Sequence, residues 1–188
     1  MEIWDLMDKD RNPLGVTHPR GQQYPLPPHT YHLAVSVFVV DKNNRILLTL
    51  RDPRKRMYPN YWEYTGGSAV AGEDSVTAAM RELLEETGIA VERQDMIFLG
   101  GVREPTAFMD CYLVRLPCDG EEVAITFQDG ETVDARWMSL YDFDQLLHRP
   151  EQIPQSCAMR YGFVRAKMGE ILGEDAWLAP LDTQGETP

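Results

Sequence analysis

Long hydrophobic runs are absent from this sequence of 188 residues. A helix that crosses a membrane needs about 18 or more consecutive apolar residues, and no stretch of the chain approaches that length. The first residues, Met1 to Asp5, are acidic and do not form the basic segment and apolar stretch of a secretory signal. We therefore expect a cytoplasmic protein without a membrane partner.

Positive charge is scarce as well. The chain has 18 Lys and Arg against 30 Asp and Glu, which gives a net charge of -12. Proteins that bind long nucleic acids need Lys and Arg to replace the counterions of the phosphate backbone, so we expect no such partner. A small phosphorylated substrate would also be repelled unless a divalent cation or a local basic cluster reversed the field. The composition therefore points toward a metal ion.

Cysteine is rare, and its placement excludes two kinds of scaffold. Cys111, Cys118 and Cys157 are an odd number of thiols without a closely spaced pair, so neither a disulfide framework nor a zinc ribbon is indicated. Cys111 alternates with polar neighbours in an apolar run, which is typical of a buried strand residue rather than a nucleophile. We expect all three thiols to be reduced.

The chain divides into three expected parts: residues 1–30, 31–172 and 173–188. The first part has the pattern of a short hairpin followed by a proline-rich connector, Tyr24 to Pro28. The second part is long enough for one globular domain. The third is polar apart from residues 177–181, and we expect it to be loosely ordered.

Hydrophobic periodicity predicts the elements of the middle part. Strands are expected at residues 33–40, 45–50, 96–102, 107–116 and 133–138. Helices are expected at residues 74–87, 140–147 and 154–172. The first helix ends at Gly88, a residue that commonly adopts the left-handed conformation that stops a helix.

Three acids share one face of the predicted helix at residues 74–87. Glu82, Glu85 and Glu86 stand at positions i, i+3 and i+4, and apolar residues gather on the opposite side: Val76, Met80, Leu83 and Leu84. Like charges at these spacings destabilise an isolated helix by a few tenths of a kcal/mol per pair, so solvent or a cation must offset them. Clustered carboxylate oxygens are the ligands that Mg2+ and Mn2+ prefer.

The neighbours of these acids suit a binding face. Arg81 precedes Glu85 by four residues and can pair with it or with Glu82, which would fix the orientation of the carboxylates. Ala78 and Ala79 are small, and we expect them to flank the acidic face and allow a ligand to approach closely.

A glycine pair precedes the helix. Gly66 and Gly67 permit backbone conformations that other residues avoid, and they let main-chain groups approach a metal ion or a phosphate. Gly67 is followed by five residues, then Glu73, then seven residues, then Arg81 to Ile89, which reads RELLEETGI. This pattern resembles the Nudix box, the loop-helix-loop signature of the Nudix hydrolases, with every specified position filled.

The resemblance covers about residues 30–150, and only the box is highly specific. It implies an α/β/α sandwich with a mixed β-sheet, the Nudix helix on one face and the late helices on the other. It also implies Mg2+-dependent hydrolysis of a diphosphate linkage in a small phosphorylated metabolite, with Mn2+ as an alternative ion. The implied metal ligands are Glu82, Glu85, Glu86 and the carbonyl of Gly67.

The implied mechanism needs a carboxylate that accepts a proton from the attacking water. Glu82 and Glu86 are candidates within the box. Glu131 is the candidate outside it, because it follows a turn that approaches the metal helix in the resembled fold. Arg81 belongs to the catalytic set as the residue that orients these acids, and Glu73 is expected to orient Arg81 and the loop.

The densest basic segment, Arg51 to Arg56, is the candidate for binding the substrate's phosphates. Arg51, Lys55 and Arg56 are the residues we assign to this role, with a solvated turn as the alternative for each. The aromatic residues that follow, from Tyr58 to Trp62, could stack on a base or belong to the sheet.

The stretch from Tyr31 to the box also resembles isopentenyl-diphosphate isomerase and its hydrolase relatives. The isomerase needs a catalytic cysteine just before the helix, where this chain has Thr65 to Ser68. Isomerase activity is therefore not expected. His32 matches a metal ligand of the isomerase, but we expect it to be structural or to face the substrate. A nucleotide-sensing module without catalysis is a further alternative, and whether two chains form a homodimer stays open.

Overall fold

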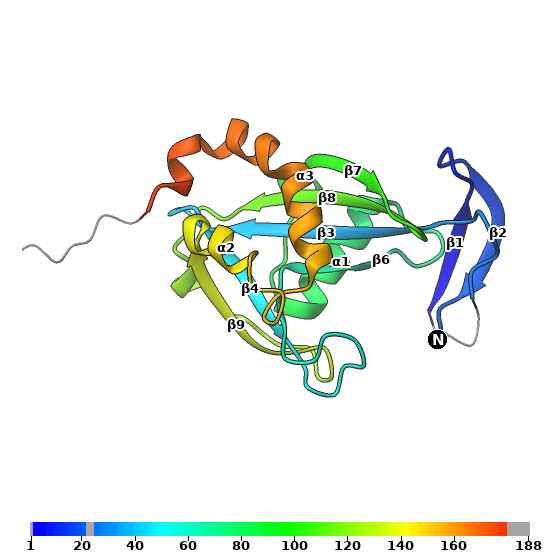
Figure 1. Cartoon of the computed structure of the whole chain (residues 1–188), viewed down its shortest axis with the longest axis horizontal. Helices are drawn as coiled ribbons and strands as arrows, with labels where there is room; N and C mark the ends of the chain where they lie inside the picture. The colour runs from blue at the N-terminus through cyan, green and yellow to red at the C-terminus, as the bar shows by residue number, and fades with distance from the viewer. Residues whose placement is uncertain (1, 22–24, 180–188) are drawn as a thin grey trace, which may run out of the picture.

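The computed structural model describes residues 2–21 and 25–179. Tyr24 of the expected connector and residues 180–188 of the expected tail lie outside the described residues. A mixed seven-stranded sheet forms the centre of the described chain, and a separate two-stranded hairpin stands at one end of it (Figure 1). No described helix is both long enough and apolar enough to cross a membrane.

The strands follow the predicted order. The hairpin contains β1 (Ile3–Met7) and β2 (Pro13–Pro19). The large sheet contains β3 (His32–Val40), β4 (Arg45–Arg51), β5 (Trp62–Glu63), β6 (Thr65–Ser68), β7 (Ile97–Arg103), β8 (Ala107–Arg115) and β9 (Thr132–Ser139). The helices are α1 (Ser75–Thr87), α2 (Leu140–Leu146) and α3 (Gln155–Leu172). The sequence did not predict β5 and β6, which are short and follow the aromatic stretch directly.

β3 is the central strand of the sheet. It pairs in parallel with β8 from His32 opposite Ala107 to Val40 opposite Arg115, and antiparallel with β6 along its first half. β3 meets β4 only where Val40 pairs with Ile46, and β4 then turns away to pair with β9 and β5 (Figure 1). Because β3 and β4 diverge, the sheet opens beside β6, and the functional site lies at this opening.

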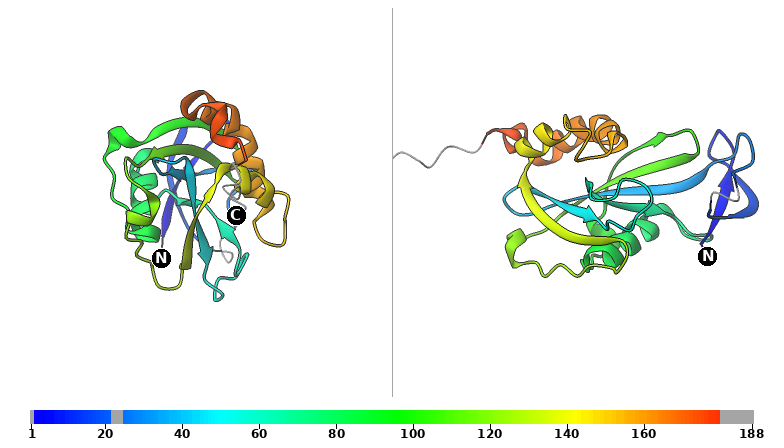
Figure 2. Two further views of the ribbon diagram at one scale, coloured as in Figure 1. Left: turned by 90° about the vertical axis from the view of Figure 1, so that its left-hand side faces the viewer. Right: turned by 60° about the horizontal axis from the view of Figure 1, so that its bottom comes forward.

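Helices cover both faces of the sheet. Alternate side chains of β3 point to opposite sides, so that Ala34 and Phe38 pack toward α2 and α3, whereas Val35 and Val37 pack toward α1. The view in Figure 2 shows α1 on one side of the sheet and α2 and α3 on the other. The fold is therefore the expected α/β/α sandwich with a mixed sheet.

Local sequence sets both ends of α1. The Asp74 side chain accepts a hydrogen bond from the Thr77 amide at 2.8 Å and caps the first turn. Gly88 adopts φ 75°, and its N–H donates to the Leu84 carbonyl, which is the predicted left-handed stop. These caps fix where α1 begins and ends, and therefore where the acids of the box lie along the helix.

Two expectations about the faces of α1 were wrong. Ala78 and Ala79 do not let a ligand approach the helix closely, because both side chains are fully buried against the sheet. Leu84 was expected on the apolar side but is half exposed. The helix packs closely on the sheet through Ala78, Ala79 and Leu83. The side of the helix that faces the sheet is therefore rotated relative to the apolar side that the helical wheel suggested.

The N-terminal hairpin is tied firmly to the sheet. Trp4 stacks on His32 with 3.9 Å between ring centroids and 9° between planes, and Leu6 is almost fully buried. At the other end, the Arg11 guanidinium donates two hydrogen bonds to the buried Asp110 carboxylate at 2.8 and 2.5 Å. These contacts hold the hairpin as part of the folded body.

The start of the expected tail is ordered, contrary to the prediction. Trp177 is buried, its Nε1 donates to the Tyr161 hydroxyl at 2.6 Å, and the Arg165 guanidinium lies 3.5 Å from its ring centroid. The tryptophan therefore packs against α3 and joins the core, whereas Glu174, Asp175 and Leu178 beside it are exposed. A single large aromatic residue in a polar segment was the signal for this contact.

Candidate active site

A hollow in front of α1, which we call the acidic pocket, collects most of the predicted site residues. Its walls are α1, β6, the end of β4, the turn before β9 and the N-terminal hairpin. The predicted residues that line it are Arg51, Lys55, Gly67, Arg81, Glu82, Glu85, Glu86 and Glu131. Three further lining residues were not predicted: Glu2, Arg20 and Gln128.

Glu86 is the most buried acid of the pocket, with 7% of its surface exposed. Its carboxylate accepts one long hydrogen bond, 3.4 Å from the Gly66 amide. Burial, and after it the nearby carboxylates of Glu63 and Glu82, raises the pKa of Glu86 well above that of a free glutamate. A cation bound in the pocket would oppose this rise and favour the ionised carboxylate.

Arg81 organises the other acids of the box. Its guanidinium donates to Glu82 and to Glu85 at 3.0 Å each, and to Glu73 at 2.9 and 3.0 Å. A further bond to the Ser68 carbonyl at 3.0 Å ties the same group to β6. One arginine thus spans the helix, the preceding loop and the sheet.

The pKa of Glu73 is shifted in the opposite direction from that of Glu82. It accepts hydrogen bonds from Arg81 and from the Val70 amide at 3.0 Å. Burial opposes its ionisation, but these hydrogen bonds outweigh burial and lower the pKa of Glu73. In Glu82, by contrast, burial prevails and raises the pKa. The ionised Glu73 contacts Arg81 and the loop and does not line the pocket.

Glycine is required at positions 66 and 67 because neighbouring groups lie too close to leave room for a side chain. A Cβ on Gly66 would lie 2.4 Å from the Val35 carbonyl oxygen, and a Cβ on Gly67 would lie 2.2 Å from the carboxyl carbon of Glu82. Neither glycine adopts a positive φ, so the freedom that glycine gives to the backbone is not used here. Both residues are in β6, and any side chain at position 67 would fill the space in front of Glu82.

The donor set of the acidic pocket fits a divalent cation. Within residues 2–21 and 25–179, no three acidic, histidine or cysteine side chains already converge into a cage for an ion. Mg2+ does not need such a cage, because it commonly keeps several waters and takes one or two carboxylates together with substrate phosphates. The Glu82 carboxylate, which lies close against Gly67, and the buried carboxylate of Glu86 offer oxygen ligands of this kind.

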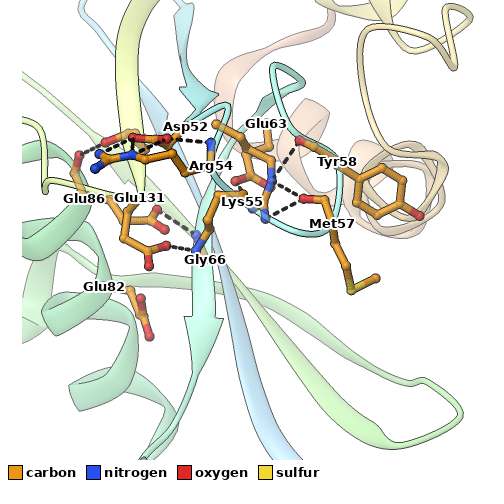
Figure 3. A network of polar contacts seen from close by, with 12 residues as sticks. Asp52, Arg54, Lys55, Met57, Tyr58, Glu63, Gly66, Glu82, Glu86 and Glu131 are labelled. Atoms are coloured by element: carbon orange, nitrogen blue, oxygen red, sulfur yellow. Dashed lines mark hydrogen bonds and ion pairs between the residues drawn. The ribbon is translucent and has the colours of Figure 1, made fainter. Parts of the chain in front are cut away.

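Glu131 enters the pocket from the side opposite α1. It follows a turn in which Gly130 has φ 81°, and its carbonyl accepts a hydrogen bond from the Asp52 amide at 2.9 Å. Its carboxylate contacts the ammonium of Lys55. Figure 3 shows Glu82, Glu86 and Glu131 close together, with Lys55 and Gly66 beside them.

The basic segment divides into three environments. Arg51 and Lys55 line the acidic pocket, and Arg51 also donates to Glu63 at 2.6 Å. Arg54 pairs with acids of its own turn and of the turn before β9. Arg56 is exposed and does not line the pocket, so its predicted contact with phosphate is not supported. The spacing of charges along a turn does not reveal which of them point inward.

A second hollow, which we call the inner cavity, adjoins the first between β3, β5, β6 and α3. The two share Arg51, Gly66 and Gly67. His32 lines the inner cavity; burial lowers its pKa, and its Nδ1 lies 3.2 Å from the Leu33 carbonyl oxygen. The imidazole is therefore neutral at pH 7.

Sequence reasoning missed the charged residues of the inner cavity: Glu63, Glu104 and Arg160. They come from β5, from the segment after β7 and from α3, and no motif links them. The one available signal was Glu63, an acid within an aromatic stretch that is otherwise suited to a strand.

A family model described as the NUDIX domain matches residues 30–159. The chain belongs to the Nudix hydrolase family. The Nudix box is the segment from β6 through α1 that forms one wall of the acidic pocket. As a Nudix hydrolase the chain is an enzyme of the pyrophosphohydrolase class, and enzymes of this family generally use divalent metal ions.

Three similar proteins illustrate the relationship. An uncharacterised Nudix hydrolase of Listeria monocytogenes is 34% identical over 161 residues, which cover 82% of this chain and 89% of the relative. A prenyl-diphosphate phosphatase of Methanosarcina mazei is 29% identical over 136 residues, which cover 71% of this chain and 78% of the relative. A crystal structure from Deinococcus radiodurans has a TM-score of 0.70 at 18% identity, covering 87% of this chain and 99% of that one. This last likeness concerns the fold alone.

Proposed function

We propose that this Nudix hydrolase depends on Mg2+ and cleaves the diphosphate linkage of a small metabolite, such as a nucleoside diphosphate bound to a further group. The observation that carries the proposal is that the acids of α1 and Glu131 line the same pocket as Lys55 and Arg51. Oxygen ligands for a cation and positive groups for a phosphate therefore meet in one hollow. Mn2+ prefers similar oxygen ligands and can replace Mg2+.

The proposed ligands of the ion are the carbonyl of Gly67 and the carboxylates of Glu82, Glu85 and Glu86. When bound, the ion neutralises the diphosphate and lowers the pKa of the attacking water. Arg81 and Glu73 keep the carboxylates of the helix oriented through the hydrogen bonds described above. The carboxylates of Glu82 and Glu85 are thus held in place before the substrate arrives.

Glu131 is the proposed proton acceptor, with Glu82 and Glu86 as alternatives within the box. Acids that bind a cation are weaker bases, because the cation holds their electron density. Glu131 faces the pocket from the other wall and contacts Lys55. A substrate phosphate that draws Lys55 toward itself would release the Glu131 carboxylate, so substrate binding would also prepare the base.

Phosphorus NMR of a panel of diphosphate compounds, incubated with Mg2+ in 18O-labelled water, tests the function and identifies the attacked phosphorus. We expect hydrolysis that stops in excess EDTA. Glu85→Gln and Glu86→Gln should each lower the rate by about a hundredfold or more, the scale of losing charge stabilisation in a transition state. Wild-type rates in both variants, or full activity in EDTA, would refute the metal assignment.

The same panel includes isopentenyl diphosphate, and no conversion to dimethylallyl diphosphate is expected. The position that needs a thiol lies in β6, which has the sequence TGGS. Cys157 does line the inner cavity, but burial raises the pKa of its thiol to about 12, so it is not a thiolate at neutral pH. Isomerised product at enzymatic rates would overturn this expectation. We also propose a cytoplasmic location, supported by the free state of all three cysteines.

A further inference from the structure

The inner cavity is the hollow next to the proposed diphosphate site. It has a volume of about 280 Å³ and adjoins the acidic pocket at Arg51, Gly66 and Gly67. A diphosphate held at the acids of α1 therefore has its attached organic group next to this opening. The lining of the inner cavity then determines which organic groups fit.

The charges of the inner cavity are balanced. Arg51 donates to Glu63 at 2.6 Å, and Arg160 forms two hydrogen bonds to Glu104 at 2.6 and 3.0 Å. All four side chains are at least partly buried. Two cations paired with two anions leave the inner cavity with no excess of either charge, so the cavity suits an uncharged group.

Hydrogen-bonding groups dominate the lining. The buried Ser36 hydroxyl donates to the Met109 sulfur at 3.3 Å, a weak acceptor, and the neutral His32 faces the same space. Both carboxylates can accept further hydrogen bonds beyond those from their arginines. A hydrocarbon group would displace water from these polar groups without replacing its hydrogen bonds, which costs about 1–3 kcal/mol per unsatisfied group.

We propose that the inner cavity binds the organic group of the substrate and that this group carries several hydroxyls, as a sugar or polyol does, rather than a prenyl chain. The proposal rests on the diphosphate hydrolysis proposed above. It gives this chain a different preference from the one that the name of its Methanosarcina mazei relative indicates for that protein. Hydroxyls supply the donors and acceptors that Glu63, Glu104 and Ser36 can use.

Two five-carbon substrates separate the alternatives. Ribose 5-diphosphate and isopentenyl diphosphate are both diphosphate esters of a primary alcohol, and they differ in the hydroxyls of the organic group. We expect kcat/KM for ribose 5-diphosphate to be at least about a hundredfold higher, because sites built for hydroxyls strongly reject analogues that lack them. Isothermal titration with the methylene-bridged analogues of both compounds should give the same order of affinity without turnover.

A double variant tests whether the lining sets the preference. Glu104→Met together with Arg160→Met replaces one ion pair by apolar side chains, a change that often leaves stability unaltered. We expect the ratio of kcat/KM values to shift at least about tenfold toward isopentenyl diphosphate. Ser36→Ala should shift it in the same direction with little effect on the fold. Thr17→Val on the exposed face of β2 is the matched control and should leave the ratio unchanged.

The outcomes are distinct. Equal or better cleavage of isopentenyl diphosphate by the wild-type enzyme overturns the inference while leaving the hydrolase function intact. A ratio that stays constant in both Ser36→Ala and the double variant also overturns it. Hydrolysis of no diphosphate in the wider panel, by contrast, removes the proposed function itself.

Discussion

Glu131 illustrates how a single residue can depend on its partner. It lies on the opposite wall of the acidic pocket from Glu86, and its carboxylate contacts the Lys55 ammonium. Its side chain is 38% exposed, so the fold does not rely on it. A residue of this kind can serve the reaction with little consequence for stability.

We expect Glu131→Gln to lower the turnover rate by about tenfold or more, the lower edge of general-base effects, and to change the pH profile. Thermal unfolding should move little, because surface substitutions usually change stability by less than about 0.5 kcal/mol. Steady-state kinetics across pH and a melting curve check both points. Normal turnover of this variant, beside an inactive Glu82→Gln, assigns the base to the box instead.

At the scale of elements, the hairpin of β1 and β2 completes the acidic pocket. Glu2 and Arg20 line the pocket from this hairpin, and the hairpin is held in place at its far end by Arg11 and Asp110. Asp110 is almost fully buried, whereas the Arg11 side chain is 40% exposed. Loss of the arginine would leave a buried carboxylate without its charged partner.

Arg11→Met should therefore lower the free energy of unfolding by about 1–3 kcal/mol, the range for hydrogen bonds to charged groups after allowance for partial exposure. Lys9→Met removes the same charge from the same turn, but Lys9 pairs with Asp10 at the surface, so its effect should be much smaller than that of Arg11→Met. Urea unfolding of both variants provides the comparison. Equal effects would mean that the hairpin is not anchored through Asp110.

Sequence predicted the elements whose signals are local. The length and limits of α1 followed from its period, from Asp74 and from Gly88, and the spacing of the box placed its acids correctly on one side. β5 and β6 have two and four residues, and their pairing with β4 and β3 gives them their conformation. No local sequence pattern predicts strands of this kind.

The site was predictable to the same extent. Residues within the box were found because a helix brings positions i, i+3 and i+4 together, whatever the rest of the fold does. The lining of the inner cavity depends on the divergence of β3 from β4 and on where α3 packs. Both are determined by contacts between residues that are far apart in the sequence. Arg160 and Glu104 therefore could not be recognised as partners, and exposure of Arg56 could not be separated from that of Lys55.

At the scale of the whole molecule, the acidic pocket concentrates negative charge in a chain that already carries a net charge of -12. The pKa of Glu86 is raised, chiefly by burial and then by neighbouring carboxylates. A carboxyl group with a raised pKa in the folded state contributes stability at low pH and loses that contribution as pH rises through the raised pKa. Without metal, the contribution of Glu86 to stability should thus decline as pH rises.

Glu86→Gln removes this ionisation. In EDTA the variant should gain stability relative to the wild type as pH rises above the pKa of an unfolded glutamate, about 4.3. Saturating Mg2+ stabilises the wild type selectively, because the ion binds the folded state and offsets the charges, so the difference should shrink or reverse. Urea unfolding with and without Mg2+ measures both effects. A difference that depends on neither pH nor Mg2+ contradicts this account.

The parallel pairing of β3 with β8 has a consequence for how the chain connects. Parallel neighbours cannot be joined by a tight turn; they need a long crossover. Here the chain between them contains β4, β5, β6, α1 and β7, so the Nudix box lies inside the crossover itself. The segment that carries the acids is thus also part of the connection between the two central strands. One stretch of sequence therefore supplies both the crossover of the sheet and the acids of the pocket.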